Sequence, residues 1–192
     1  MRITLSAKQL FNPLLLAVVV GLVLGGLLMV SGSRVVNALQ QETEVTLVTP
    51  TEAYAGELIT VTLVVNNAQN LAGYQGLVRY DADYLTVAGV VPEKGLTLSG
   101  RDMMPLEPVR SQGVVFLGAG TCPVSDCSVS TYNSVPRFTL GVDGYVELST
   151  LQFLVGPPGS YDLLLENVQL VDPQGNQLSA TVTNTTLNVI SR

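Results

Sequence analysis

Short apolar runs alternate with polar turn residues from residue 44 to the end of this 192-residue chain. The runs are rich in Val, Leu, Thr and Tyr, and clusters of Gly, Pro, Asn and Asp separate them at spacings of about ten residues, which is typical of a β-sandwich. No window of a dozen residues carries a helical stripe of apolar positions. The pattern predicts strands at residues 44–48, 58–66, 72–80, 85–91, 113–118, 137–140, 145–155, 160–165, 168–171 and 178–190.

Alternation inside two of these segments indicates which side chains face the core. Val61, Leu63 and Val65 occupy every second position of residues 58–66, so they are expected on one buried face. Gln75, Leu77 and Arg79 alternate with apolar residues and glycine, and are expected on an outer face. Asn66-Asn67 is interpreted as a turn, and residues 92–112 and 119–136 are expected to be irregular crossings between sheets.

The N-terminal segment has the pattern of a membrane or export signal. Arg2 and Lys8 precede an uncharged stretch over residues 10–33, whose apolar core spans residues 14–30. As a helix this core reaches about 26 Å, at the short end of a bilayer span and longer than an ordinary signal h-region. Residues 36–38, Val-Asn-Ala, would suit a signal peptidase. A retained single-pass anchor and a cleaved signal peptide therefore both stay open.

These patterns predict three parts along the chain. Residues 1–38 are the signal peptide or anchor, with its hydrophobic helix at about 10–33, residues 39–43 are a linker, and residues 44–192 form one sandwich domain. Positive charge before the helix predicts a cytoplasmic N-terminus and a domain outside the cytoplasm. The expected location is the cell membrane, with secretion as the alternative.

Composition and charge exclude several functions. The chain has no histidine, which excludes Ser-His-Asp and Cys-His nucleophile systems and imidazole metal ligands. Residues 39–192 hold six basic and fifteen acidic side chains, a net charge of −9. Nucleic-acid binding requires clustered Lys and Arg, so no nucleic-acid partner is expected. No cofactor is expected either.

The two cysteines, Cys122 and Cys127, are separated by four residues. An exported chain meets an oxidising compartment, so a disulfide that closes a small loop is expected. Metal binding would need more thiols or imidazoles than the chain contains, and no metal site is expected.

The order of several motifs resembles a known family. Ala-Gly-Glu-Leu-Ile-Thr-Val at 55–61 is followed by Leu-Ala-Gly-Tyr-Gln-Gly-Leu-Val-Arg-Tyr-Asp at 71–81, with Leu85 after the turn, and Leu-Glu-Asn-Val-Gln-Leu-Val-Asp stands at 165–172. Over residues 44–190 the chain resembles the cohesin domain of cellulosomal scaffoldins and its relatives among carbohydrate-binding modules. The resemblance implies a jelly-roll or immunoglobulin-like sandwich of about nine strands. It also implies a non-catalytic role, the capture of a dockerin module on a flat sheet face.

The resemblance places the candidate partner site on the strand before Tyr-Asp. Cohesins of the first type carry an Asn and an Asp there, where this chain has Gly73 and Gln75. The polar contact pair of the family is therefore missing. Gln75, Leu77 and Arg79 are the candidate partner-binding residues, and an ordinary solvated sheet face is the alternative.

Other candidate residues support different functions less directly. Asp81 and Asp83, two residues apart at a strand end, could reach the separation of a glycosidase acid pair only by chance, and Asp81 is expected to cap its turn. Neither a cleft nor a calcium loop is indicated. Trp, the residue that stacks best on sugar rings, is absent, so a sugar-binding patch would have to use tyrosine. The candidate patch is Tyr132, Asn133 and Arg137. Residues 103–106, Met-Met-Pro-Leu, suit either a soft interaction surface or a cover over the open end of the sandwich.

The leading hypothesis is thus a non-enzymatic recognition module outside the cytoplasm that binds a dockerin-like protein, with polysaccharide degradation as the expected setting. Carbohydrate binding and a structural role in an envelope complex are the alternatives.

Overall fold

The computed structural model describes residues 41–122 and 140–192. Glu42–Arg192 form one compact unit. The buried apolar cluster runs from Val45 to Val189 and lies wholly inside this unit, so the unit contains the core that a domain needs to fold alone. In the described residues, no helix has the length and apolar character that a membrane span requires. The predicted signal segment and its boundaries lie outside the described residues.

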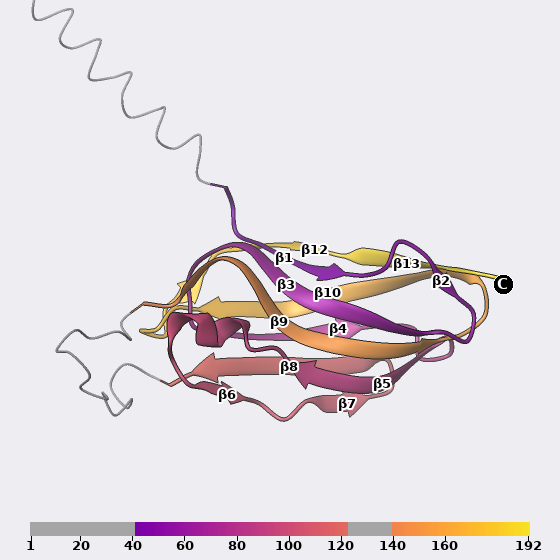
Figure 1. Cartoon of the computed structure of the whole chain (residues 1–192), viewed down its shortest axis with the longest axis horizontal. Helices are drawn as coiled ribbons and strands as arrows, with labels where there is room; N and C mark the ends of the chain where they lie inside the picture. The colour runs from indigo at the N-terminus through magenta and orange to yellow at the C-terminus, as the bar shows by residue number, and fades with distance from the viewer. Residues whose placement is uncertain (1–40, 123–139) are drawn as a thin grey trace, which may run out of the picture. The chain divides into compact units, whose positions relative to one another are not determined.

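The first sheet of the sandwich has the order β12-β1-β3-β9-β5 (Figure 1). Its neighbours run antiparallel, except for β1 and β12, which pair in parallel. The strands are β1 (Glu44–Val48), β3 (Leu58–Leu71), β5 (Leu85–Pro92), β9 (Val142–Val155) and β12 (Thr181–Thr183).

The second sheet has the order β2-β13-β10-β4-β8-β6, with β11 paired to β10 and β7 paired to β8. A 3-10 helix, η3 (Gly95–Ser99), contacts β9 and is the short coil in Figure 1. The strands are β2 (Ala53–Tyr54), β4 (Gly73–Arg79), β6 (Met103–Pro105), β7 (Val109–Ser111), β8 (Val114–Thr121), β10 (Gly159–Val171), β11 (Gln177–Leu178) and β13 (Thr185–Ile190).

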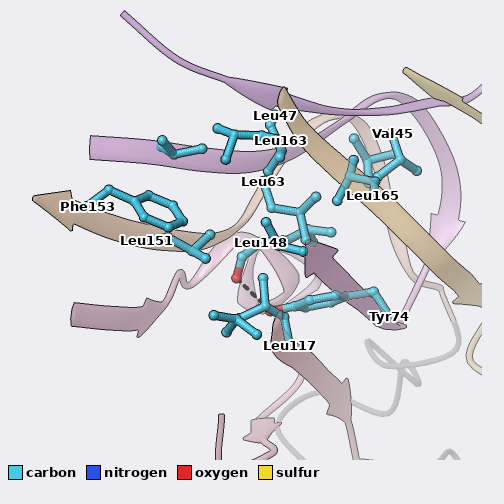
Figure 2. Packing of buried hydrophobic residues seen from close by; sticks show 14 of the residues in the cluster. Val45, Leu47, Leu63, Tyr74, Leu117, Leu148, Leu151, Phe153, Leu163 and Leu165 are labelled. Carbon is cyan, nitrogen blue, oxygen red and sulfur yellow. Dashed lines mark hydrogen bonds between the residues drawn. The ribbon is translucent and has the colours of Figure 1, made fainter. Parts of the chain in front are cut away.

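The core lies between the two sheets, as the alternation of the sequence predicts. Val61, Leu63 and Val65 of β3 are each at most 3% exposed. Figure 2 shows the residues that meet there, with Leu148 and Phe153 from the first sheet among side chains of the second. The all-β sandwich fold predicted from the sequence is confirmed.

Two predicted strand breaks are wrong, and asparagine explains both. β3 continues through Asn66-Asn67 to Leu71, and its register with β9 shifts there. Asn67 has φ 52° and Asn167, inside β10, has φ 51°. Asparagine tolerates the left-handed region better than most residues, so it marks β-bulges here instead of turns. The predicted strands 160–165 and 168–171 are therefore one strand, β10, with a register shift between Glu166 and Gln169.

The edges of the sandwich also differ from the prediction. Residues 92–112, expected to be irregular, contain η3, β6 and β7, and the predicted strand 178–190 is divided among β11, β12 and β13. The three strands have different places in the sandwich, since β11 and β13 pair with β10 and β12 pairs with β1. At the break between β12 and β13 the Asn184 side chain accepts the N–H of Leu165 at 2.8 Å. The described residues thus carry thirteen strands, and the short additions lie mainly at edges, where pairing rather than sequence pattern holds them.

Candidate functional site

The outer face of the second sheet carries the three candidate partner-binding residues. β4 lies between β10 and β8, and its inward residues Tyr74 and Val78 are buried. Gln75 and Leu77 are half-buried and Arg79 is exposed. The structure therefore brings the three predicted residues onto one face, and their role in binding stays a prediction. We use "outer face" for the outward-facing residues of β10, β4, β8 and β6.

Two polar pairs cross this face between β4 and β10. Gln75 Nε2 donates to Gln169 Oε1 at 2.9 Å, and Arg79 donates to both oxygens of Glu166 at 2.8 Å each. The hydrogen bonds and charge of Arg79 lower the pKa of Glu166. An exposed ion pair of this kind adds little stability, so its main consequence is that both charges are neutralised on the face. The sequence analysis missed Gln169 and Glu166, because the bulge at Asn167 sets their register against β4.

A row of residues with two glycines at its centre crosses four strands at one end of the outer face. In register, Val171 of β10 lies opposite Gly73 of β4, Gly73 opposite Gly120 of β8, and Gly120 opposite Met104 of β6. Two glycines in the middle of the row leave the sheet backbone without side chains. They form the floor of a hollow of 450 Å³. We call it the glycine hollow; its lining residues are Gly73, Tyr74, Gln75, Met104, Leu106, Ala119, Gly120, Gln169 and Val171.

Leu106 covers the next row of the sheet, at Gly118, and forms one wall of the glycine hollow. Leu106 donates its N–H to the carbonyl of Gly118 at 2.9 Å, and its side chain lies over that glycine. A Cβ on Gly118 would be 2.8 Å from Leu106 Cδ1, and one on Gly73 would be 2.9 Å from Val171 Cγ2. A Cβ on Gly120 meets no atom within 4 Å. Gly120 is therefore the open part of the floor.

A buried arginine holds the strand that carries Met104. Arg101 is 2% exposed and donates Nε–H to Thr121 Oγ1 at 2.8 Å and a second N–H to the Cys122 carbonyl. Burial lowers its pKa. These bonds fix the start of β6 against the end of β8. In the apolar run 103–106, Met103 packs against the core and Met104 is 50% exposed beside the hollow.

Asp81 and Asp83 belong to a turn. Asp81 Oδ1 accepts the N–H of Asp83 at 3.0 Å, and the Asp81 carbonyl accepts the N–H of Leu85 at 2.9 Å. The predicted turn-capping role of Asp81 is confirmed. Within residues 41–122 and 140–192, no group of three or more His, Cys, Asp or Glu side chains is placed to hold a metal ion.

A second hollow, of 410 Å³, lies where η3 meets β9. Tyr145 is 55% exposed there, and its hydroxyl donates to Glu147 Oε1 at 3.4 Å. Leu98 of η3 is 75% exposed. The sequence analysis missed this group because its members come together only when η3 packs on β9. The lining residues are Glu93, Lys94, Gly95, Thr97, Leu98, Tyr145 and Glu147.

Several predicted residues lie outside the described part of the chain. Tyr132, Asn133 and Arg137, the candidate sugar site, are among them, and so is Cys127. The sugar site and the Cys122–Cys127 disulfide therefore stay predictions.

Comparison with protein-family models and with curated proteins finds no match for this sequence. Solved structures do match. The non-cellulosomal cohesin of the hyperthermophilic archaeon Archaeoglobus fulgidus has a TM-score of 0.59 and 18% identity, and the match covers 79% of this chain and 93% of that one. A cohesin module of a Clostridium perfringens family 33 glycoside hydrolase has a TM-score of 0.59 and 9% identity, over 79% of this chain and 98% of that one.

A third match is a cohesin solved in a type I cohesin–dockerin complex from Clostridium thermocellum. Its TM-score is 0.59 at 10% identity, with 79% of this chain and 95% of that chain covered. Identities this low leave the fold as the shared property. The described part of the chain has the cohesin-type β-sandwich fold, which is the fold that its sequence resemblance implies.

Proposed function

We propose that this domain is a non-catalytic recognition module that binds a dockerin-like protein through its outer face. The observation that carries the proposal is a central strand of the cohesin-type fold, β4, which presents Gln75, Leu77 and Arg79 on one open face. Several matched cohesins are solved in complexes with dockerins. The non-catalytic role is supported by Asp81 and Asp83, whose geometry is that of a turn.

Leu77 gives the sharpest test of the face. In register it lies between Phe116 of β8 and Glu166 of β10. Leu77→Lys would put a cation in the centre of the face, and the lysine stem would still cover part of the apolar surface. Thr60→Lys is the matched control, because Thr60 is exposed on β3 in the other sheet.

The assay is isothermal titration of residues 42–192 with a panel of type I and type II dockerin modules. We expect at least one to bind, with Leu77→Lys weakening binding by at least about tenfold, or 1.4 kcal/mol, and Thr60→Lys leaving it unchanged. Equal affinity in both variants would place the partner elsewhere on the domain. The absence of binding to every dockerin would overturn the proposed partner class.

Carbohydrate binding is a second candidate, and the hollow beside η3 favours it. The exposed ring of Tyr145 offers an apolar face for a sugar ring, and Glu147 and Glu93 supply acceptors for its hydroxyls. Affinity electrophoresis with soluble glucan, xylan and mannan tests this. Tyr145→Ala should abolish any retardation, whereas Tyr54→Ala, at another exposed tyrosine, should not. Migration of the wild type unaltered by every glycan would end the second candidate.

We further propose that the domain works outside the cytoplasm. Arg2 and Lys8 before the apolar stretch support this location, as does the cysteine pair. Protease added to intact cells that express the full chain should then digest the domain. A domain protected until the cells are lysed would contradict it. A link to polysaccharide degradation is supported only by analogy with the cohesin module that belongs to a glycoside hydrolase.

A further inference from the structure

The geometry points to the glycine hollow as a socket for one aliphatic side chain of the partner protein, a side chain that Lys or Arg residues flank. This inference rests on the proposed function and specifies its contact. Open hollows of 450 Å³ fall within the size range of sites that take small organic groups. The floor at Gly120 is backbone only, so an entering side chain reaches the sheet itself.

The polar groups around the hollow favour an apolar occupant. The amide of Gln75 is already hydrogen-bonded to Gln169. A polar side chain of the partner would have to displace this bond. An aliphatic group displaces only water from Met104, Leu106 and Val171, and that burial is favourable.

The charges nearest the hollow favour a basic partner segment. Asp102 is exposed and precedes Met104 by two residues, and its carbonyl accepts the N–H of Cys122, which extends the β6–β8 ladder. By strand alternation Asp102 therefore shares the outer face with Met104. The described basic side chain that is nearest to Asp102 in sequence, Arg101, is buried. Lys or Arg on the partner would complement Asp102.

The experiment uses methionine methyl groups as reporters. Met103 and Met104 are the only methionines of residues 42–192, so ¹³C-methyl labelling of this unit gives two NMR signals. Met103 packs on the core and serves as the internal control. The probes share one leucine side chain and differ in charge: leucinamide, N-acetyl-leucinamide and N-acetyl-leucine. At pH 6 they are cationic, neutral and anionic, since an α-amino group has a pKa of about 8 and an α-carboxyl of about 3.5.

We expect all three probes to shift the Met104 signal and to leave that of Met103 in place. Their affinities should rank cation, neutral, anion, with steps of about two- to fivefold, the contribution of an exposed ion pair. Gly120→Val fills the floor and should remove the Met104 shift, while Thr60→Val on the other sheet retains it. An unshifted Met104 signal, an equal shift in Gly120→Val, or a reversed charge order would overturn the inference.

A dockerin titration separates this inference from the proposed function. A dockerin that binds the wild type and Gly120→Val equally would leave the proposed function intact and refute the socket. Probes that shift Met104 in a domain that binds no dockerin would support the socket and refute the proposed partner class.

Discussion

The hydrogen bonds of Tyr74 across the core give a quantitative test of the sandwich. Tyr74 is on β4 in the second sheet, and its hydroxyl is 2.8 Å from the Leu148 carbonyl on β9 in the first sheet (Figure 2). The same hydroxyl is 2.8 Å from Ser149 Oγ, on the next residue of β9. The phenol has one proton, which goes to the carbonyl, so the Ser149 hydroxyl donates to the phenol oxygen. Tyr74 and Ser149 are 5% and 2% exposed. Tyr74→Phe would remove both bonds: the Leu148 carbonyl keeps the N–H of Glu93 at 2.9 Å, and the buried Ser149 hydroxyl loses the acceptor of its proton.

The size of the effect follows from the two hydrogen bonds that are lost. Each contributes about 0.5–1.5 kcal/mol net. The ring stays in place, so no apolar contact is lost. We expect Tyr74→Phe to lower the free energy of unfolding by about 2 kcal/mol and Ser149→Ala by about 1 kcal/mol. The double variant should lose about 1 kcal/mol less than the sum, since the two changes share one bond.

Urea unfolding and thermal melts of residues 42–192 measure these values. For a domain of this size, 2 kcal/mol corresponds to a fall in Tm of about 4–8 °C. A loss below about 0.5 kcal/mol, or additivity in the double variant, would refute the role given to this hydroxyl.

The pH dependence of stability provides an independent check on Tyr74. Burial raises its pKa above the ordinary value of 10.0. The folded state binds the phenol proton of Tyr74 more tightly than the unfolded state does, so protonation of Tyr74 stabilises the fold. That stabilisation is fully present below pH 10 and is lost as pH rises through the folded pKa. Wild type should therefore lose stability above pH 10 more steeply than Tyr74→Phe.

Three further predictions concern glycine and surface charge. Gly95→Ala should cost about 1–3 kcal/mol in urea unfolding, because its Cβ would lie 2.1 Å from the Glu147 carbonyl oxygen; Gly120→Ala, whose Cβ has free space, should instead stabilise by about 0.4–1 kcal/mol. The side-chain amide of Asn176 and the backbone N–H groups of Asn176 and Gln174 donate to Asp172 and lower its pKa, so the stability gap between wild type and Asp172→Asn should close as pH falls below 3.8; a gap independent of pH would contradict this. Glu166→Gln should leave Tm unchanged in thermal melts, because its ion pair with Arg79 is exposed, and a clear fall in Tm would show that the pair stabilises the fold.

Local alternation and turn chemistry predicted most of the fold. β1 has its predicted ends, and the buried positions of β3 and the outward positions of β4 follow from a period of two. The strand breaks expected near Asn67 and Asn167 were wrong because asparagine tolerates positive φ, which occurs in turns and in β-bulges alike. Only pairing with β9 shows that β3 is continuous, and only pairing with β4 shows that the two predicted halves of β10 form one strand.

The candidate site, like the fold, was determined by the sequence only in part. A single strand carries Gln75, Leu77 and Arg79, so the sequence alone determined that they share a face. The glycine hollow joins Gly73, Gly120, Met104 and Val171 from four strands, and nothing in their sequence neighbourhoods indicates that they meet. A period of two places a residue on a face of its own strand, but the register between strands depends on bulges, edge strands and the buried Arg101. Those long-range contacts exist only in the tertiary structure, and they decided where the outer face is hollow.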